Sequence, residues 1–581
     1  MRRCHHALSS IIGCLLIFKM VKWASAFQYK LHLDSNGRYL FEWSVDYQKN
    51  NVNVQITAKV TQDIWFAVGF SDYGSVTSAD LVVFWTDGHG NHHFVDGYTN
   101  DHGIILPDDQ QDYFLTSVAA DHGAVVLDFY RRFNTCDEQD YTLDNGTTHV
   151  IFFESVYANE LPFGHVVSSL GHAVKRVQLL KPELPMPVLP NDTWTFEVRA
   201  PEILIPSVET TYWWHTTILP RIPTNHHIVK YSGVISEGNE DLVHHMEVFH
   251  CQVPKGQKIP YYSGPAENED TPKGLEPCRR VIAAWAMGAQ DMVYPEEAGV
   301  SIGGQDTSRF ALLEVHYNNP ERKSGRMDNS GIRFYVTSQL RKNEAGIMEL
   351  GLEYINKMAI PPGQKKFKLS GYCVQDCTRV GLPPGGIYVF ASQLHTHLTG
   401  RRLYTKHVRQ GLELPELNRD NHFSPHFQEI RRLPQPHNVL PGDELVTTCE
   451  YDTRSRDKAT IGGFSITDEM CVNYIHYYPR TELEVCKSSI QTNALQTFFF
   501  LLNRLEDAKV YPDAGDRANY VNINWTPVNA QLLDELYATS PLSMQCNRSD
   551  GVRFPGDWEH QKVSEIAQPL VARDMDTCPS S

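Results

Sequence analysis

Alternating apolar and polar residues form short stretches along the first third of the chain. In NVNVQITAKV (51–60) every second residue from Val52 to Ala58 is apolar, which is the pattern of a strand with one buried face. DLVVFW (80–85) and AVVLDFY (124–130) predict further strands, and turn sequences such as DYGS, DGHGN and DNGT separate such stretches. This region therefore predicts an all-β sandwich.

Prolines then interrupt the pattern. KPELPMPVLPND (181–192) has four prolines and no periodicity, which predicts a linker. Two β-rich regions without a long amphipathic helix follow and suggest a pair of sandwiches. QTFFFLLNRLEDA (496–508) and NAQLLDELYA (529–538) instead have the apolar spacing of helices. The predicted regions are a signal at 1–26, a first sandwich at 27–180, a linker at 181–193, β regions at 194–365 and 366–525, and a C-terminal segment at 526–581.

The N-terminus has the pattern of a secretory signal peptide. Arg2 and Arg3 precede an apolar run at 11–18, and the ASA sequence at 24–26 supplies small residues for cleavage. Lys19 ends the run well short of the roughly 20 residues that a membrane-spanning helix needs. We expect a secreted or lumenal protein without a transmembrane segment, and an uncleaved anchor is the alternative.

Charge and cysteine content agree with this expectation. The net charge of −17 argues against nucleic acid as a partner. Two of the 12 cysteines, Cys4 and Cys14, lie in the predicted signal, and the even number that remains suits disulfides formed in an oxidising compartment. N-glycosylation sequons, which also suit the secretory route, occur at Asn145, Asn191, Asn524 and Asn547.

Four segments place histidine or methionine in strand-like patterns. They are HHMEVFHC (244–251), ALLEVHYNNP (311–320), ASQLHTHLTG (391–400) and DEMCVNYIHYYP (468–479). Residues i and i+2 share one face of a strand, so His395 and His397 can share a metal ion. His244 and His245 point oppositely in an ideal strand, so the backbone must bulge or twist if both bind one ion.

The chemistry of these donor groups narrows the choice of metal. Imidazole suits zinc, copper, iron and nickel, whereas a thioether points to Cu(I). One candidate copper site is His395, His397 and Met470, and a second is His244, His245 and His316. With 26 histidines in the chain, each candidate histidine taken alone is better explained as a structural or surface residue, and a methionine on a strand face is usually core packing. The residues alone leave both interpretations open.

The same segments resemble a known family. HHMEVF, LEVHYNNP, QLHTHLTG and EMCVNYIHYYP are similar, in sequence and in order, to the signature segments of the copper type II, ascorbate-dependent monooxygenases. The resemblance covers nearly the whole mature chain, and the first region is similar to a DOMON domain. It implies two antiparallel, jelly-roll-like copper domains that face each other across a solvent-filled gap.

The resemblance also implies roles for individual residues. It assigns an electron-transfer copper to His244, His245 and His316, and a catalytic copper to His395, His397 and Met470. Ascorbate would reduce the two coppers one electron at a time, and dioxygen would bind at the methionine-containing site. Tyr212 is implied to lie near the substrate, whereas the pair His226-His227 and His476 are not ligands in the family.

The cysteines follow the family in part. The resemblance implies the disulfides Cys136–Cys578, Cys251–Cys278, Cys373–Cys486, Cys377–Cys546 and Cys449–Cys471. A further bridge common in relatives is missing, because Trp214 and Ala266 stand where its cysteines are expected. No cysteine lies between Cys486 and Cys546, so we expect any homo-oligomer to be non-covalent.

Three functions follow from these observations. The first is a copper- and ascorbate-dependent monooxygenase that hydroxylates a C–H bond of a small substrate, by analogy a phenylethylamine. The alternative is a catalytically silent extracellular copper-binding or interaction protein, in which Trp214 beside Tyr212 has closed the pocket. A weaker hypothesis gives the DOMON-like region its own ligand, haem or sugar. His89, His92 and His93 lie in a glycine-containing turn there, and a surface loop explains them better.

Overall fold

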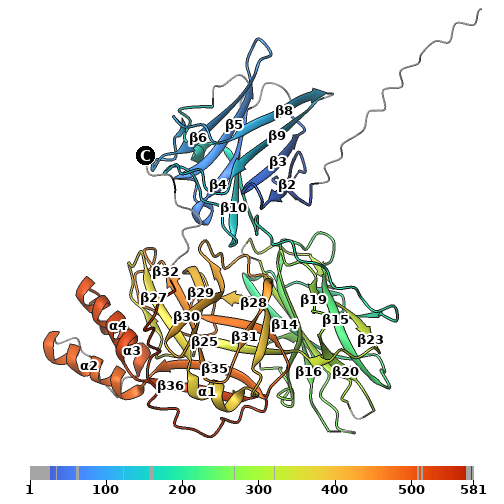
Figure 1. The fold of residues 1–581 in the computed structure, drawn as a ribbon, viewed down its shortest axis with the longest axis vertical. Helices are drawn as coiled ribbons and strands as arrows, with labels where there is room; N and C mark the ends of the chain where they lie inside the picture. Colours follow the sequence, from blue (N-terminus) through green and yellow to red (C-terminus); the bar gives the residue numbers. More distant parts are fainter. Residues whose placement is uncertain are drawn as a thin grey trace, which may run out of the picture. The chain divides into compact units, whose positions relative to one another are not determined.

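The computed structural model describes residues 27–34, 36–60, 65–121, 123–155, 162–254, 256–266, 269–305, 307–319, 321–506, 510–511, 515–570 and 578. The predicted signal at 1–26 lies outside this range. The chain divides into two compact units, one formed by residues 1–62 and 112–132 and the other by residues 63–111 and 133–581. The predicted all-β class is confirmed, since strands make up most of the regular structure (Figure 1).

The first unit is one antiparallel sheet. Its strand order is β1-β2-β3-β9-β8, with β1 Tyr29–His32, β2 Tyr39–Asp46, β3 Asn51–Ala58, β8 Phe114–Asp121 and β9 Ala124–Arg132. In β3 the apolar residues predicted to face inward are buried and their polar neighbours are half-buried. The period-two pattern therefore identifies the buried face of this strand.

The second unit begins with a six-stranded sheet. Its order is β11-β10-β4-β5-β6-β7, with β4 Phe66–Ser71, β5 Ala79–Thr86, β6 His92–Thr99, β7 Ile105–Pro107, β10 Thr148–Glu154 and β11 Gly171–Val177. Short 3₁₀ turns lie at η1 (Asp72–Gly74) and η2 (Val167–Ser169). The proline-rich segment predicted as a linker contains no strand or helix.

The next region is a sandwich of two sheets. One has the order β12-β23-β15-β20-β24 with β19 beside β15, and the other has the order β17-β14-β21-β16-β18. The strands are β12 Trp194–Arg199, β13 Ile203–Leu204, β14 Thr210–Ile218, β15 Asn225–Val234, β16 Val243–Cys251, β17 Ser263–Pro265, β18 Cys278–Ala286, β19 Met292–Val293, β20 Ala298–Gly303, β21 Phe310–Asn318, β22 Met327–Asp328, β23 Gly331–Thr337 and β24 Asn343–Glu344. Apolar residues from both sheets form one core, which Phe390 and Tyr478 of the following region join.

The last region is a second sandwich. Its sheets have the orders β31-β28-β34-β25-β35-β36 and β27-β32-β29-β30. The strands are β25 Gly346–Leu352, β26 Ala359–Ile360, β27 Phe367–Cys373, β28 Ile387–His395, β29 Gly400–Arg409, β30 Leu412–Asp420, β31 Arg431–Val439, β32 Asp443–Tyr451, β33 Thr460–Ile461, β34 Val472–Tyr478, β35 Leu483–Ile490 and β36 Leu542–Arg548. Strand β25, which precedes the predicted boundary at residue 365, pairs with β34 and β35 in this sheet.

Four α-helices complete the fold of the described residues. They are α1 Gln375–Gly381, α2 Thr492–Glu506, α3 Asp516–Asn522 and α4 Pro527–Thr539. Helices α2 and α4 match the two predicted segments, although residues 507–508 of the first lie outside the described range. The short helices α1 and α3 were not predicted. Helices α2, α3 and α4 pack their apolar faces onto the β27–β32 side of the last sandwich (Figure 1).

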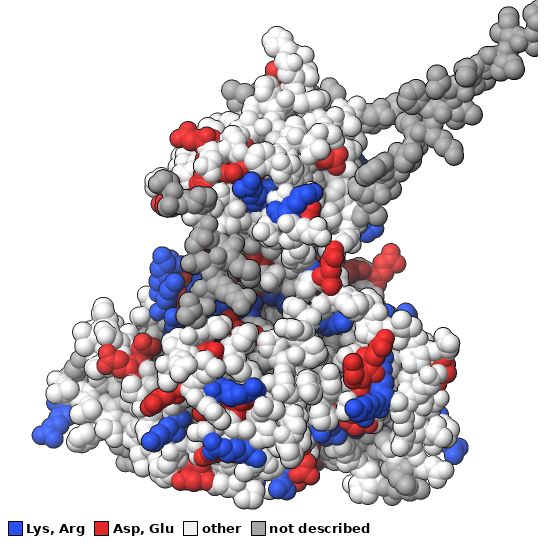
Figure 2. Space-filling view, viewed as in Figure 1, with Lys and Arg blue, Asp and Glu red and all other residues white. Residues whose placement is uncertain are grey.

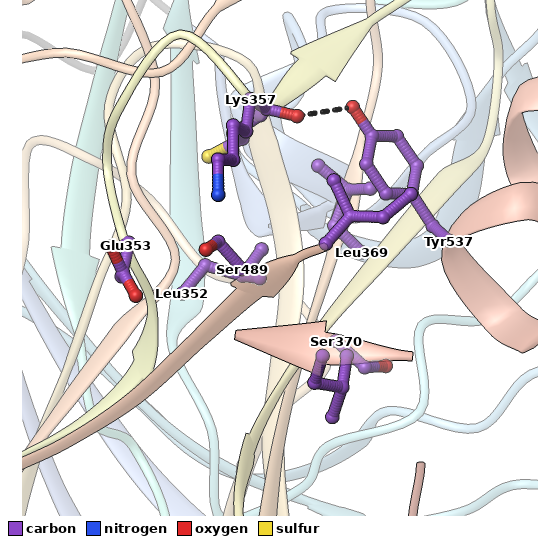
Figure 3. A pocket seen from close by; sticks show the side chains of 10 residues that line it. Leu352, Glu353, Lys357, Leu369, Ser370, Ser489 and Tyr537 are labelled. Carbon is purple, nitrogen blue, oxygen red and sulfur yellow. Dashed lines mark hydrogen bonds between the residues drawn. The ribbon is translucent and has the colours of Figure 1, made fainter. Parts of the chain in front are cut away.

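A small cavity lies under helix α4. The Tyr537 hydroxyl donates a hydrogen bond of 2.8 Å to the Lys357 carbonyl, and Leu369 and Ser489 line the same space (Figure 3). Its volume of about 20 Å³ has room for about one water molecule and not for an organic ligand. The cavity is therefore a packing feature of the helical segment.

All five implied disulfides are present: Cys136–Cys578, Cys251–Cys278, Cys373–Cys486, Cys377–Cys546 and Cys449–Cys471. Among the described residues, every helix is too short or too polar to cross a membrane. On the face drawn in Figure 2, acidic and basic side chains are interspersed.

His227 and Glu344 give one prediction about stability. His227 Nε2 lies 2.9 Å from a Glu344 carboxylate oxygen, and the Ser301 amide donates to the other oxygen at 3.1 Å. Burial alone would raise the pKa of Glu344, but the hydrogen bonds from His227 and Ser301 outweigh it and lower the pKa to about 2. Glu344 therefore stabilises the fold above its unfolded pKa of about 4.5, and this contribution is lost as the pH falls towards 2.

We expect Glu344→Gln to be less stable than the wild type at pH 6, with a difference that shrinks as the pH falls below about 4.5. Urea unfolding at several pH values measures it. The exposed Glu240→Gln is the control. A stability difference that stays constant between pH 6 and pH 3 would contradict the role of the Glu344 carboxylate.

Candidate metal centres

Three neighbouring strands place one histidine set on a single face. In the register of β14, β21 and β16, Tyr212 lies opposite His316, and His316 lies opposite His245. Two residues further on, Trp214, Glu314 and Glu247 form a second row. Because the side-chain period of a strand is two, both rows point to the same side of the sheet.

A bulge brings His244 into the same set. The pairing of β16 with β21 shifts register between Val243 and His245, as two adjacent ligands require. His244 Nδ1 lies 3.2 Å from His245 Nδ1, which lies 3.2 Å from His316 Nδ1. Nitrogens of the three rings all lie within 4.8 Å of one another.

The electrostatics of this set suit a metal. Burial lowers the pKa of His244, His245 and His316, and the neighbouring imidazoles lower the pKa of the last two further. The rings are therefore neutral at physiological pH, and a neutral imidazole has one nitrogen lone pair to give. Convergent neutral nitrogens fit a divalent or monovalent transition metal such as copper.

Tyr212 covers one side of this set. Its ring stacks on His316 with centroids 4.2 Å apart and an interplanar angle of 3°, and it lies 5.8 Å from the His245 ring. Burial raises the pKa of Tyr212 to about 12, so the phenol keeps its proton. The structure thus brings this predicted site residue directly against the histidines.

The second set lies where β28 ends and β34 begins. His395 is the last residue of β28, His397 lies two residues beyond it, and Met470 lies two residues before the start of β34. His395 Nδ1 lies 2.6 Å from the side-chain oxygen of Gln428, and His397 Nδ1 lies 3.1 Å from the Asp468 carbonyl. Each Nδ1–H therefore donates to an oxygen, which fixes the tautomer and leaves Nε2 as the lone-pair nitrogen.

Burial keeps this set neutral as well. The pKa of His395 falls to about 3 through burial and the nearby His397, and burial lowers the pKa of His397. The two rings are perpendicular, with centroids 5.3 Å apart, and Met470 is 8% exposed. Two imidazoles and a thioether form a soft donor set that suits Cu(I).

A buried carboxylate holds the backbone of this set. Glu469 accepts hydrogen bonds from the amides of His397 at 2.9 Å, Thr399 at 2.7 Å and Met470 at 3.2 Å, and from the Thr399 hydroxyl at 2.7 Å. Four donors on one carboxylate tie the two ligand segments together although they are about 70 residues apart. Sequence reasoning missed Glu469, although its place directly before Met470 was a signal.

The two sets lie near each other. His395 and His397 are among the groups that lower the pKa of His245, and His244 in turn lowers the pKa of His395. The two sets are therefore close enough for their groups to interact electrostatically.

Two glutamates lie on the same face of the sheet as the all-histidine set. Glu314 accepts a hydrogen bond of 2.5 Å from the Trp214 indole, and its other oxygen lies 3.9 Å from His245 Nε2. Burial and the carboxylates of Glu314 and Glu349 raise the pKa of Glu247 to about 8. The register gave a signal for Glu247 and Glu314, since each lies two residues from a predicted ligand on a strand.

The facing sheet contributes the third carboxylate. Glu349 lies opposite Tyr474 in the β25–β34 pair, and Lys487 donates to it at 2.8 Å. The Tyr474 ring lies 6.3 Å from the His395 ring. Acidic and aromatic side chains therefore extend from the second histidine set towards the first.

Histidines outside the two sets have structural surroundings. The buried His476 packs against Phe390 with ring centroids 6.3 Å apart. His93 stacks on Trp85 at 4.6 Å and lies 3.1 Å from an Asp87 oxygen. At the position of the missing bridge, the Ala266 amide donates to the Tyr212 carbonyl at 2.7 Å.

Comparison with known proteins agrees with this arrangement. Residues 196–324 match the N-terminal domain and residues 343–499 the C-terminal domain of the copper type II ascorbate-dependent monooxygenases, and residues 35–155 match the DOMON domain. Dopamine beta-hydroxylase of Homo sapiens is 46% identical over 96% of this chain and 90% of its own length. Tyramine beta-hydroxylase of Caenorhabditis briggsae is 38% identical, covering 93% of each chain, and DBH-like monooxygenase protein 1 of Homo sapiens is 31% identical over 93% of this chain and 90% of its own.

These identities extend over nearly the whole chain, and the histidine and methionine sets fit the copper that such enzymes use with ascorbate. The chain belongs to the copper type II, ascorbate-dependent monooxygenase family.

Proposed function

We propose that this copper monooxygenase hydroxylates a C–H bond of a phenylethylamine, with copper held by His244, His245 and His316 at one site and by His395, His397 and Met470 at the other. The observation that carries the proposal is the convergence of His244, His245 and His316, with His395 and His397 near them and glutamates beside them. Copper held at these sites would supply one-electron transfer from ascorbate and the activation of dioxygen.

The protein's own residues have distinct roles in this proposal. The Met470 thioether favours Cu(I) over Cu(II), which suits the site that must react with dioxygen. Gln428 and the Asp468 carbonyl accept hydrogen bonds from Nδ1 of His395 and His397, so that each Nε2 lone pair would be available to a metal. Tyr212, stacked on His316, keeps water from one side of the all-histidine site.

An acidic surface beside the copper sites supports an amine substrate. Glu247, Glu314 and Glu349 lie close enough for their charges to interact, while Lys487 pairs with only one of them. A protonated amine would lower the mutual repulsion of these carboxylates and form a charge-assisted hydrogen bond. The names of two relatives specify dopamine and tyramine, and both molecules carry such an amine on a two-carbon chain attached to an aromatic ring.

Metal analysis and oxygen-uptake measurements on the purified protein test this proposal. We expect two coppers per chain by metal analysis, and ascorbate-dependent oxygen uptake with tyramine that produces the β-hydroxylated amine. Copper binding without hydroxylation of any member of a phenylethylamine panel would instead favour the catalytically silent alternative. Retention of all six donor residues in two buried, neutral sets favours the enzyme.

The Glu469 carboxylate gives a further prediction. In Glu469→Gln the side-chain amide nitrogen would face backbone N–H donors. Some of the hydrogen bonds that hold the backbone at His397 and Met470 would therefore be lost. We expect about a 10- to 100-fold loss of copper affinity at the second site or of kcat. Copper titration and steady-state kinetics measure it, with the buried Glu450→Gln of β32 as control. Equal effects of the two substitutions would show that Glu469 has no special role.

We also propose that the protein acts in the secretory pathway, either lumenal or secreted, and that any homo-oligomer is non-covalent. The signal pattern and five disulfides support an oxidising compartment. Pulse labelling that finds the protein in the cytosol, with free thiols, would contradict this assignment.

A further inference from the structure

One loop contacts both histidine sets. It comprises residues 421–430, NHFSPHFQEI, and connects β30 to β31. The Pro425 carbonyl lies beside the His244 ring, whose pKa it raises, and the Gln428 side-chain oxygen accepts a hydrogen bond from His395 Nδ1 at 2.6 Å. A displacement of this loop would therefore move ligands of both centres.

The middle of the loop is tightly packed. The Gln428 amide donates to the Pro425 carbonyl at 2.7 Å, so the two contacting residues are joined. Phe427 packs against Gly288, where a Cβ would lie 2.5 Å from the phenyl ring. The neighbouring Met287 amide donates to the His244 carbonyl at 2.8 Å. The loop thus packs tightly against the segment that follows β18.

The ends of the loop are held by a turn far away in sequence, just before β10. Asp420 accepts hydrogen bonds from the Thr147 amide at 3.0 Å and the Thr147 hydroxyl at 2.6 Å. Arg431, the residue after the loop, donates to Asp420 at 3.0 Å and to the Thr147 hydroxyl at 2.9 Å. Asp420 is 2% exposed, so these groups form a buried network joined by one hydroxyl.

Two further contacts hold the first residues of the loop. Asn421 donates to the Asp144 carboxylate at 2.8 Å. His422 Nδ1 lies 2.7 Å from an Asp72 oxygen, and the Tyr73 hydroxyl donates to the Asn421 carbonyl at 3.3 Å. Residues 72–73 and 144–147 therefore contact the first residues of the loop and the two residues that flank it, Asp420 and Arg431.

We propose that Thr147 and Asp420 are positioning residues for the copper ligands: they fix the ends of the 421–430 loop and thereby the places of Pro425, Gln428, His244 and His395. This inference rests on the ligand roles proposed above. It gives residues 72–73 and 144–147, which match the DOMON domain, a function in aligning the copper sites without contact with substrate or metal. Buried networks of this kind have few alternative arrangements, so they hold geometry rather than merely adding stability.

A pair of neighbouring threonines provides the test. Thr147→Val removes the hydroxyl that joins Asp420 to Arg431 while keeping the shape of the side chain. Thr148→Val is the matched control, because Thr148 is also buried, at 1% exposure, and its hydroxyl oxygen has no hydrogen-bond partner among the described residues. Both variants remove one buried hydroxyl from adjacent positions.

We expect Thr147→Val to increase amide hydrogen exchange in residues 421–430 of the metal-free protein about tenfold. Copper affinity at the His395 site should fall about tenfold, and the Cu(II) electron paramagnetic resonance spectrum should change. Thr148→Val should alter none of these quantities. Equal responses of the two variants, or faster exchange in the loop with unchanged copper affinity and spectrum, would overturn the proposal.

Gln428 variants test the final link to His395. Gln428→Leu removes the acceptor for His395 Nδ1 and should reproduce the spectral and affinity changes. Gln428→Glu keeps that acceptor but loses the donor to Pro425, so it should restore the wild-type spectrum only in part. A spectrum unchanged in Gln428→Leu would overturn the proposal. These measurements need no substrate, so they decide this inference even if no amine is hydroxylated and the proposed function fails.

Discussion

Replacing Met470 by alanine is expected to lower hydroxylation at least 100-fold while leaving copper bound at His244, His245 and His316. A change in the hydrogen-bonded surroundings of a metal ligand already costs about 10- to 100-fold, and removal of a ligand should cost more. The remaining imidazoles, His395 and His397, are harder donors that favour Cu(I) less strongly than a thioether does. Metal analysis should show the loss of copper from one site only.

Met348 is the control for this experiment. It is 1% exposed on β25, in the same sheet as β34, and packs in the apolar core of the last sandwich. Met348→Ala should lower stability by about 2–5 kcal/mol, as for other buried methionines, yet keep both coppers and most of the activity of the folded fraction. Full activity of Met470→Ala would show that Met470 is a core residue and no ligand.

The strand pattern predicted local structure well and long-range pairing poorly. The alternation in 51–60 gave β3 and its buried face, because period two alone decides which side chains point inward. The pattern could not show that β25 pairs in parallel with β35. That pairing depends on contacts between residues about 130 positions apart, which no local periodicity reports.

For the metal centres too, the sequence predicted local features well and long-range contacts poorly. The i and i+2 spacing of His395 and His397 permitted a shared ion, and the expected irregularity at His244 is present as a register shift. Gln428 is a different case, since it comes from a loop 33 residues beyond His395 and leaves no pattern in the sequence around the ligands. Resemblance to a family supplied the ligand set, whereas only the fold supplies the groups that orient it.

Trp214 is where this chain departs from the pattern expected of its relatives. Its indole donates to Glu314, which in turn lies 3.9 Å from His245 Nε2. The lost bridge is thus accompanied by a hydrogen bond that occupies one carboxylate of the acidic surface. Because Glu314 is engaged by Trp214 and Glu349 by Lys487, Glu247 is the carboxylate best placed to bind a cationic substrate.

Glu247→Gln is therefore expected to remove the preference for amines. It keeps the shape of the side chain and removes a carboxyl group that, with its pKa raised to about 8, would ionise beside a bound ammonium group. At pH 8 the KM for tyramine should therefore rise about 30-fold, which corresponds to roughly 2 kcal/mol for a charged hydrogen bond. The KM of an uncharged analogue such as 4-ethylphenol should change less than about threefold, because it has no ammonium group to bind.

Copper content must stay at two per chain in Glu247→Gln, since Glu247 lies two residues from His245 on β16. The buried Glu450→Gln, on β32 in the other copper domain, should leave both KM values unchanged. If tyramine and 4-ethylphenol lose affinity equally in Glu247→Gln, the carboxylate shapes the site without recognising the amine. A selective loss for tyramine would assign amine recognition to the face of β16 that also carries His245, and would explain how one strand both binds copper and selects the substrate.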